Sequence, residues 1–222
     1  MATYPQPAPP IPPLDDPATS ISAVWDNVSV SIRGRRLLRG FSHTARAGGI
    51  LGVIGPSGSD SDIVLSTLAA RRPATAGSVT IVGAPHNVAI ARLVSAQIDD
   101  PLTTVGESLR AVTPRTPTAS PTEIQGWATF TSGSVDLTTR LWGELAPGQR
   151  VRAGLACALA SGATVIAANA ADVSVPADIA RTWQAITQVA GTGRLVLVGW
   201  PTPMANMSAT ATMLAATVEV PR

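Results

Sequence analysis

The sequence predicts an α/β domain with a mixed core sheet, an antiparallel β flank and a small helical lobe. Three observations favour this fold class. Short apolar runs alternate with segments of helical periodicity, strand patterns follow one another near the N-terminus, and a glycine-rich turn joins the first buried strand to a helix. Hydrophobic residues make up 45% of the 222 residues and charged residues 14%, which suffices for one full core.

The expected elements follow in order along the chain. Strands are indicated by β-branched or continuous apolar runs, at 21–32, 35–48, 49–55, 77–83, 90–98, 164–170, 193–200 and as two short strands within 208–220. Helices are indicated by apolar residues at helical spacing, at 62–72, 104–112, 147–160 and 176–191. Pro147 is well suited to open its helix, because the first helical position needs no backbone donor.

Two segments differ in composition from the rest. Residues 1–18 hold seven prolines and are expected to form a disordered tail outside a domain at 19–222. Residues 113–139 are rich in Thr, Ser and Pro and suggest a loosely built lobe, which we place at about 98–145. No apolar run reaches the ~18–20 residues that span a bilayer, and the N-terminus lacks the pattern of a signal peptide. We therefore expect a cytoplasmic protein.

The charge pattern argues against a nucleic-acid-binding protein. All sixteen basic residues are Arg, the net charge is only +2, and no dense basic stripe with aromatic residues is present. The one cluster of basic residues comprises Arg33, Arg35, Arg36 and Arg39.

Several side chains with reactive or stacking potential have simpler structural interpretations. Cys157 lies on an apolar helical face, as a small core residue would. The histidines lack partners at ligand spacing and are expected on the surface or in loops, and four tryptophans are expected to serve as packing or interface anchors. These residues are His43, His86, Trp25, Trp127, Trp142 and Trp183.

The stretch GPSGSDSD begins like a turn that cradles phosphate and then departs from that pattern. Its first part offers glycines and small residues at Gly55, Ser57, Gly58 and Ser59. The turn continues with Asp60, Ser61 and Asp62, so that two carboxylates stand where a phosphate would need donors and cations.

From about residue 22 to residue 220, the chain resembles the nucleotide-binding domain of ATP-binding cassette (ABC) transporters. The resemblance rests on four landmarks in the expected order: LLRGFSHTARAGGILGVIGPSGS, AGSVTIVG, Gln97 in SAQIDD, and ELAPGQRVRAGLACALASGATVIAANA. It implies the ABC-type P-loop fold, with ATP and Mg²⁺ held at residues 55–62 and Gln97.

At the phosphate loop the resemblance implies Gly, Lys and Ser or Thr where this chain has Asp60, Ser61 and Asp62. The local charge is thereby three units more negative, and the chain has no lysine that could replace the missing one. Unit charges ~4 Å apart interact by ~4 kcal/mol at an effective dielectric constant of ~20. A ligand of micromolar to millimolar affinity has only ~4–8 kcal/mol of binding to lose. We expect ordinary ATP binding to be abolished or badly weakened, with no cation in the pocket to offset the carboxylates.

The other positions that the resemblance implies for catalysis are also changed. Asn169 and Ala170 stand in place of the metal-associated aspartate and the glutamate that polarises water. Trp200 replaces a histidine, Pro176 an aspartate, and Ile32 an aromatic residue that would stack on adenine. No catalytic residue is therefore expected.

The signature loop of the family, which completes the site of a partner subunit, corresponds to Leu145, Ala146, Pro147, Gly148 and Gln149. Ala146 lacks the hydroxyl that would reach a γ-phosphate, and Pro147 lacks a backbone donor. This weakens the interpretation as the silent half of a heterodimer relative to a structural or regulatory role.

Three hypotheses remain open at this stage. The first is a degenerate, catalytically inactive ABC-type subunit without a nucleotide cofactor. It would act at the inner face of the membrane with a permease or with another ABC-type subunit, as a homodimer or heterodimer. The second is an ABC transporter ATPase that binds ATP unconventionally, with Mg²⁺ held by Asp62. The third is a soluble scaffold or adaptor whose proline-rich tail recruits a partner.

Overall fold

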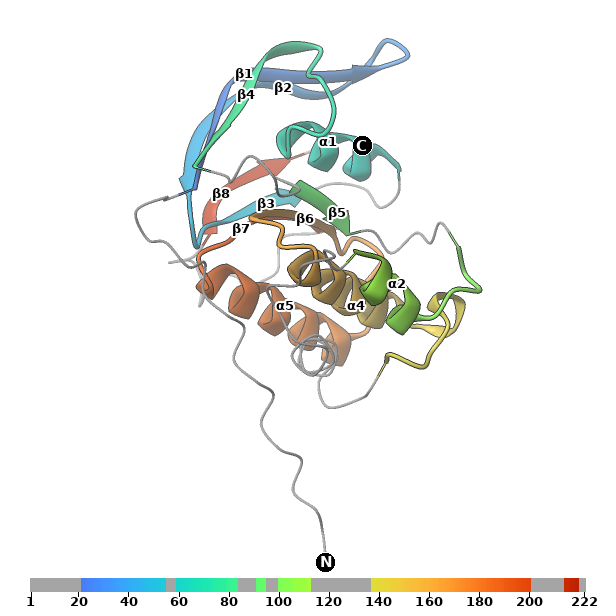
Figure 1. Ribbon diagram of the computed structural model, residues 1–222. Coiled ribbons are helices and arrows are strands. Elements are labelled where there is room, and N and C mark those ends of the chain that lie inside the picture. Colours follow the sequence, from blue (N-terminus) through green and yellow to red (C-terminus); the bar gives the residue numbers. More distant parts are fainter. Residues whose placement is uncertain are drawn as a thin grey trace, which may run out of the picture.

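A three-stranded antiparallel sheet forms one outer layer of the molecule (Figure 1). The computed structural model describes residues 21–54, 59–83, 91–94, 100–112, 137–200 and 214–219. The sheet comprises β1 (Ser22–Ile32), β2 (Arg35–Arg46) and β4 (Ala76–Val82) in the order β2-β1-β4. A two-residue turn at Arg33 and Gly34 joins β1 to β2, and both residues have positive φ, as tight hairpin turns require.

The core of the domain is a five-stranded sheet in the order β5-β6-β7-β3-β8. Its strands are β3 (Ile50–Ile54), β5 (Ala91–Val94), β6 (Val165–Asn169), β7 (Leu195–Trp200) and β8 (Leu214–Glu219). Every pairing in this sheet is parallel, so the carboxyl ends of the strands meet at one edge.

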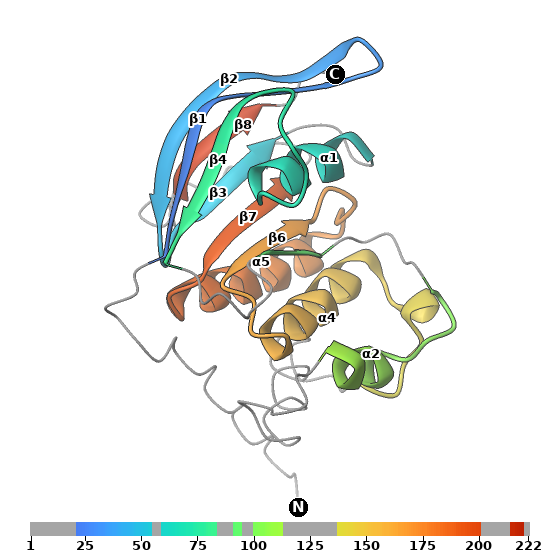
Figure 2. The same ribbon diagram turned by 45° about the horizontal axis from the view of Figure 1, so that its top comes forward.

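The helices cover both faces of the parallel sheet (Figure 2). Helix α1 (Ser59–Leu68) lies between the two sheets. On the opposite face lie α4 (Pro147–Ala160) and α5 (Pro176–Gly191), with α2 (Val105–Val112) and the short 3₁₀ helix η1 (Trp142–Glu144) beside α4. Within the described parts of the chain, no helix combines the length and the apolar character that crossing a membrane demands.

Alternation along the central strands builds two separate hydrophobic clusters. Leu195 and Leu197 of β7 point to the cluster around α1 and the antiparallel sheet, whereas Val196 and Val198 point to the cluster around α4 and α5. Because both faces of these strands are buried, their sequences read as continuous apolar runs, as in other parallel sheets with helices on both sides.

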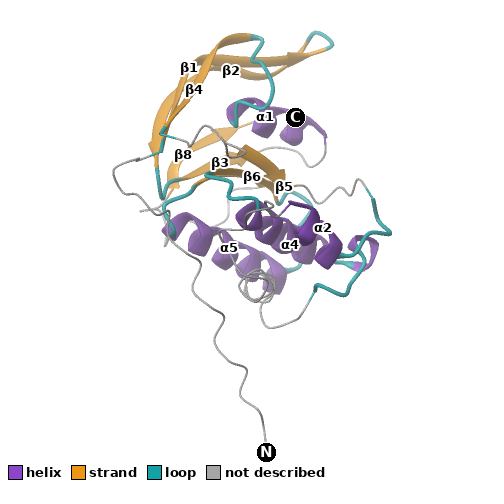
Figure 3. Cartoon of the chain, in the orientation of Figure 1, coloured by secondary structure: helices purple, strands orange, loops and turns teal. Residues whose placement is uncertain are grey.

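The predicted fold class is confirmed (Figure 3). Parallel and antiparallel pairings are divided between two sheets, and the element bounds differ mainly at the ends. Helix α1 begins at Ser59 rather than at residue 62, and of the strand expected at 90–98 the described residues contain β5 at Ala91–Val94. Of the two strands expected in 208–220, the described residues contain β8. The tail at 1–18, and residues 113–136 of the predicted lobe, lie outside the described residues.

Residues of the predicted lobe that are described pack onto the main core. Val105 and Leu109 of α2 belong to the same buried cluster as α4. The helix begins with a capping box, in which Thr104 N donates to Glu107 Oε2 at 2.8 Å and Glu107 N donates to Thr104 Oγ1 at 3.2 Å. Thr104 Oγ1 also donates to Glu107 Oε2 at 2.7 Å, and the donations from the backbone and the side chain of Thr104 to this carboxylate lower the pKa of Glu107.

The structure confirms the predicted core positions of the cysteine and of one tryptophan, but not the predicted surface position of one histidine. Cys157 and Trp25 are buried in the core as expected. His43 is not a surface or loop residue: it lies in β2, half-buried, with its ring stacked on Trp25 at a centroid distance of 6.2 Å. His86 and Trp127 lie outside the described residues.

A buried arginine joins α4 to α5. Arg152 is 2% exposed, and its guanidinium donates to Thr182 Oγ1 at 3.1 Å and to Asp178 Oδ1 at 3.3 Å. Burial lowers the pKa of Arg152, and Asp178 opposes this shift. The pair therefore keeps a charge in the core that would be costly without its carboxylate partner.

We predict that Asp178→Ala destabilises the protein by about 1–3 kcal/mol, because it leaves the guanidinium of Arg152 buried without its counter-ion. The matched variant Arg152→Met removes the charge and retains an apolar side chain, so it should cost less. Urea unfolding followed by circular dichroism measures both. Equal costs for the two variants would contradict this account of the contact.

Candidate functional site

The candidate site lies where β3, β6 and β7 end and α1 begins. Parallel pairing sets Asn169 of β6 opposite Gly199 of β7, and Ile54 of β3 opposite Trp200. Helix α1 follows β3 along the chain, and its first residues are Ser59, Asp60, Ser61 and Asp62. The sheet edge therefore brings the first turn of α1 close to the end of β6.

A hydrogen bond joins two of the predicted site residues directly. Asn169 Nδ2 donates to Asp62 Oδ1 at 2.8 Å, across 107 residues of sequence. Asn169 Oδ1 in turn accepts the backbone N–H of Ala171 at 3.0 Å, which fixes the orientation of the amide. Asn169 is 4% exposed, so this is a protected contact between the end of β6 and the first turn of α1.

Gly199 makes room for this contact. A Cβ atom at residue 199 would lie 3.1 Å from Asn169 Oδ1 and 3.0 Å from Leu65 Cδ1 of α1. Any side chain at that position would press on both the amide and the helix. The glycine thus has a structural reason that requires no ligand.

The donor set does not fit a Mg²⁺ ion held between residues 62 and 169. The amide nitrogen of Asn169 donates a hydrogen bond to Asp62. It can neither coordinate a metal ion nor accept a hydrogen bond from a water bound to that ion. Its oxygen, which could serve as a ligand, accepts the N–H of Ala171. Among the described residues, no group of three or more His, Cys, Asp or Glu side chains is arranged to hold a metal.

Asp60 is paired with a cation, contrary to the expectation from sequence. Arg35 Nη2 of β2 forms an ion pair with Asp60 Oδ2. Arg35 is 55% exposed and Asp60 only 22%, so the arginine covers the carboxylate from the solvent side. With this guanidinium included, the altered loop is two charge units more negative than the family pattern rather than three.

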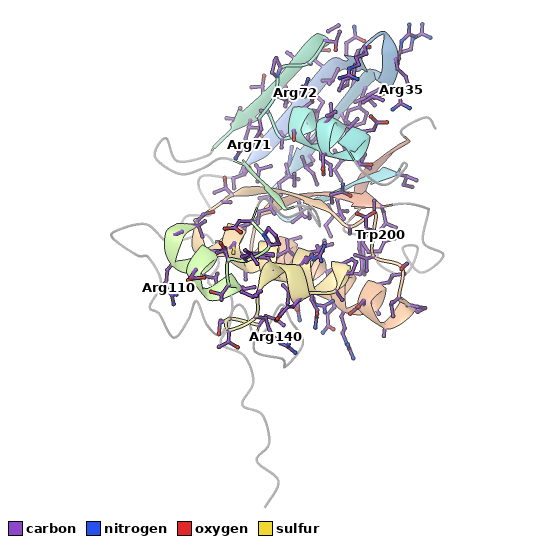
Figure 4. The ribbon with its side chains drawn as sticks, turned by 90° about the vertical axis from the view of Figure 1, so that its right-hand side faces the viewer. Arg35, Arg71, Arg72, Arg110, Arg140 and Trp200 are labelled. Carbon is purple, nitrogen blue, oxygen red and sulfur yellow. The ribbon has the colours of Figure 1, made fainter. Side chains whose placement is uncertain are left out.

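Arg35 is the functional residue that the sequence interpretation missed. It belongs to the arginine cluster at residues 33–39, whose place in the sequence does not by itself indicate a contact with Asp60. The hairpin register supplies the connection, because Arg35 pairs with Ile32 and shares the inward face of that residue. In Figure 4 Arg35 lies on the antiparallel sheet at the end of α1 opposite to Arg71 and Arg72.

The two carboxylates occupy the positions that suit an anion at a helix N-terminus. Asp60 and Asp62 both lie in the first turn of α1. A negative side chain there stabilises a helix by about 0.3–1 kcal/mol through the helix dipole. The chain's own carboxylates therefore provide the negative charge that a bound phosphate provides in other proteins.

Ser61, Ala170 and Trp200 are all buried. Ser61 and Ala170 are 0% exposed, and Ala170 N donates to Gly199 O at 2.9 Å. Trp200 packs edge-on against Trp183 of α5 at a centroid distance of 6.3 Å. The indole thus belongs to the hydrophobic cluster between the parallel sheet and helices α4 and α5 rather than to the site (Figure 4).

Pro176 and Ile32 likewise have structural roles. Pro176 begins α5, and Ile32 packs against the cluster beneath the antiparallel sheet.

The signature-like residues form the start of α4. Leu145 is buried, Ala146 is the N-cap and Pro147 is the first helical residue. Gln149 turns back, and its Oε1 accepts the N–H of Ala146 at 3.0 Å. Gly148 is buried against α5, where an added Cβ would lie 2.9 Å from Asp178 Cβ.

The start of α4 therefore satisfies one of its own donors and is closely packed against α5. Of the remaining predicted site residues, Ser59 begins α1, whereas Gly55, Ser57, Gly58 and Gln97 lie outside the described residues.

Comparison with known proteins gives a sequence match over a limited segment. No model of a known protein family matches the chain. A 79-residue stretch is 34% identical to the hemin import ATP-binding protein HmuV of Streptomyces coelicolor. This match covers 36% of the present chain and 28% of the length of that relative.

Solved structures match most of the chain. A Pyrococcus furiosus protein described as an ABC transporter ATP-binding protein aligns with a TM-score of 0.70 and 16% identity, over 90% of this chain and 97% of its own. CbiO1 of Clostridium perfringens, part of the ABC transporter complex cbiONQ, aligns with a TM-score of 0.62 and 13% identity, over 81% and 78%. The chain therefore has the fold of the ATP-binding domain of ABC transporters.

Proposed function

We propose that this protein is a degenerate subunit of the ABC type that neither binds Mg-ATP in the usual way nor hydrolyses it. It serves as a structural or regulatory partner in a membrane transport complex. The observation that carries the proposal is the hydrogen bond from Asn169 to Asp62. It joins the two positions between which a nucleotide-bound metal would be coordinated.

Electrostatics supports the loss of nucleotide binding even though Arg35 neutralises part of the charge. Asp62 adds a second carboxylate to the first turn of α1, where it accepts a hydrogen bond from Asn169. A phosphate charge ~4 Å away would be repelled by ~4 kcal/mol at an effective dielectric constant of ~20. That is comparable to the whole binding free energy of a millimolar ligand, ~4 kcal/mol.

The loss of hydrolysis follows from the end of β6. Ala170 has no group that could take a proton from water, and it is fully buried. Trp200 is occupied in packing against Trp183. Restored nucleotide binding would therefore not by itself restore turnover.

A role through protein contacts is supported by what the chain retains. Both hydrophobic clusters and the start of α4 are built from the chain's own side chains. CbiO1, which shares this fold, is part of a transporter complex, and the HmuV match concerns an import ATP-binding protein. We therefore propose a membrane permease or another ABC-type subunit as the partner, which places the protein at the cytoplasmic face of a membrane.

The alternative proposal, an ATPase that holds Mg²⁺ through Asp62, draws support from one feature. Asp62 is only half-buried, so its carboxylate is not sealed in the core. A metal there would require Asn169 to give up its hydrogen bond to Asp62.

We predict that the wild-type protein shows no micromolar binding of Mg-ATP by calorimetry and no ATP turnover above background. The triple variant Asp60→Gly, Ser61→Lys, Asp62→Ser makes the loop three charge units more positive and should bind at least tenfold more tightly, still without turnover. Circular dichroism checks that both proteins are folded. Micromolar binding or turnover by the wild type would refute the proposal.

A single substitution separates the two proposals. If Asp62 only repels phosphate, Asp62→Ala leaves nucleotide affinity unchanged or raises it, because one negative charge is removed. If Asp62 holds the metal, the same substitution abolishes binding. Asp172→Ala is the matched control, since Asp172 is an exposed carboxylate in the loop that follows β6. Calorimetry with millimolar Mg-ATP measures binding to the wild type and to both variants. A loss of binding specific to Asp62→Ala would favour the proposal that Asp62 holds a metal.

A further inference from the structure

The tip of the β1–β2 hairpin, residues 32–36, is separated from the rest of its sheet by a bulge. Ser31 pairs with Arg36 and Val30 with Leu38, so Leu37 is an extra residue on β2. A bulge of this kind interrupts the ladder and allows the strands to bend. A bend of the tip relative to the remainder of the hairpin would therefore occur at this bulge.

Apolar contacts hold the tip only weakly. On the body side of the bulge, Val30, Leu37 and Leu38 are buried, and Ser31 N donates to Thr75 Oγ1 at 2.9 Å. Beyond the bulge, Ile32 is only partly buried and residues 33–36 are all exposed. With few apolar contacts beyond the bulge, a polar contact near the end of the tip contributes a large share of what holds the tip against the domain.

The ion pair between Arg35 and Asp60 is such a contact. It joins the tip of the hairpin to the first turn of α1. The tip also carries Arg33 and Arg36, whose charges repel that of Arg35 when no carboxylate balances them. Figures 2 and 4 show the hairpin extending along α1, with Arg35 beside the start of that helix.

We propose that the Arg35–Asp60 ion pair is a latch that holds the hairpin tip over the first turn of α1, with the bulge at Leu37 as the hinge. Closed, the latch covers Asp60 and occupies Arg35. Open, it exposes Asp60 and makes Arg35 available to another anionic group. The inference goes beyond the proposed function, because it concerns the motion of the chain in the absence of any nucleotide.

Limited proteolysis of the native protein by trypsin tests the latch. Trypsin cuts after arginine, so the tip carries its own cleavage sites at Arg33, Arg35 and Arg36. The exposed Arg71 and Arg72 beyond the far end of α1 provide an internal reference. Cleavage at each site is followed by mass spectrometry and divided by its rate in the urea-unfolded chain.

Asp60→Asn removes the charge and keeps the size of the side chain. We expect cleavage at the tip to rise about twofold to fivefold, the range that corresponds to a partly exposed ion pair, while the reference sites stay unchanged. Arg35→Gln should raise cleavage after Arg36 by a similar factor. The double variant should add nothing further, because both substitutions break the same contact.

Two controls make the test specific. Asp26→Asn removes an exposed carboxylate from the same hairpin, for which the structure describes no ion pair, and should leave tip cleavage unchanged. Raising the salt from about 0.01 M to about 1 M shortens the Debye length from ~30 Å to ~3 Å. This should accelerate tip cleavage in the wild type but not in Asp60→Asn.

The latch would be overturned by unchanged tip cleavage in Asp60→Asn, by an equal effect of Asp26→Asn, or by parallel acceleration at the reference sites. The last result would mean that the whole domain had been destabilised. Because the assay contains no nucleotide, a result against the latch leaves the proposed loss of ATP binding intact. Likewise, micromolar ATP binding by the wild type would leave the latch intact.

Discussion

The first turn of α1 contains two carboxylates that the chain itself satisfies, and the character of the candidate site depends on this arrangement. Asn169 binds Asp62 from the end of β6, and Arg35 binds Asp60 from the hairpin. Each contact joins α1 to a different sheet. A helix N-terminus that would otherwise attract an external anion is thereby stabilised by internal ones.

This arrangement holds the start of α1 to both sheets through the chain's own side chains. In a nucleotide-binding protein, phosphate and metal help to hold the phosphate loop, the first helix and the neighbouring strand ends together, and binding adds to stability. Here Gly199 leaves room for the amide of Asn169, and Trp200 fills the core beside α5. The chain's own side chains thus fill the space where β6 and β7 end and α1 begins.

The same principle applies at the start of α4. Gln149 caps the backbone of Ala146, and Gly148 packs against Asp178, which in turn neutralises the buried Arg152. The signature-like segment is thus part of the α4–α5 contact. A substitution in this segment would affect folding as well as any surface that it presents to a partner, so stability has to be measured beside every functional assay.

Much of this protein was determined by local sequence pattern. The apolar runs of β3, β6 and β7 and the periodicity of α4 and α5 predicted the layers, because strands and helices that are buried on a sheet require those patterns wherever they occur. Asp60, Asp62 and Asn169 were also evident as candidate site residues, since a motif is a matter of spacing along the chain.

Only the tertiary structure decided which of these residues meet and with what consequence. Arg35 reaches Asp60 because a two-residue turn and a bulge set the register of the hairpin, and Asn169 reaches Asp62 across 107 residues because parallel strands end at one edge. The packing of the chain also stacks His43 on Trp25 and places Trp200 in the core beside Trp183. The sequence gives the sign of each side-chain charge. The distance between two charges, and therefore the energy of their interaction, depends on how the chain packs.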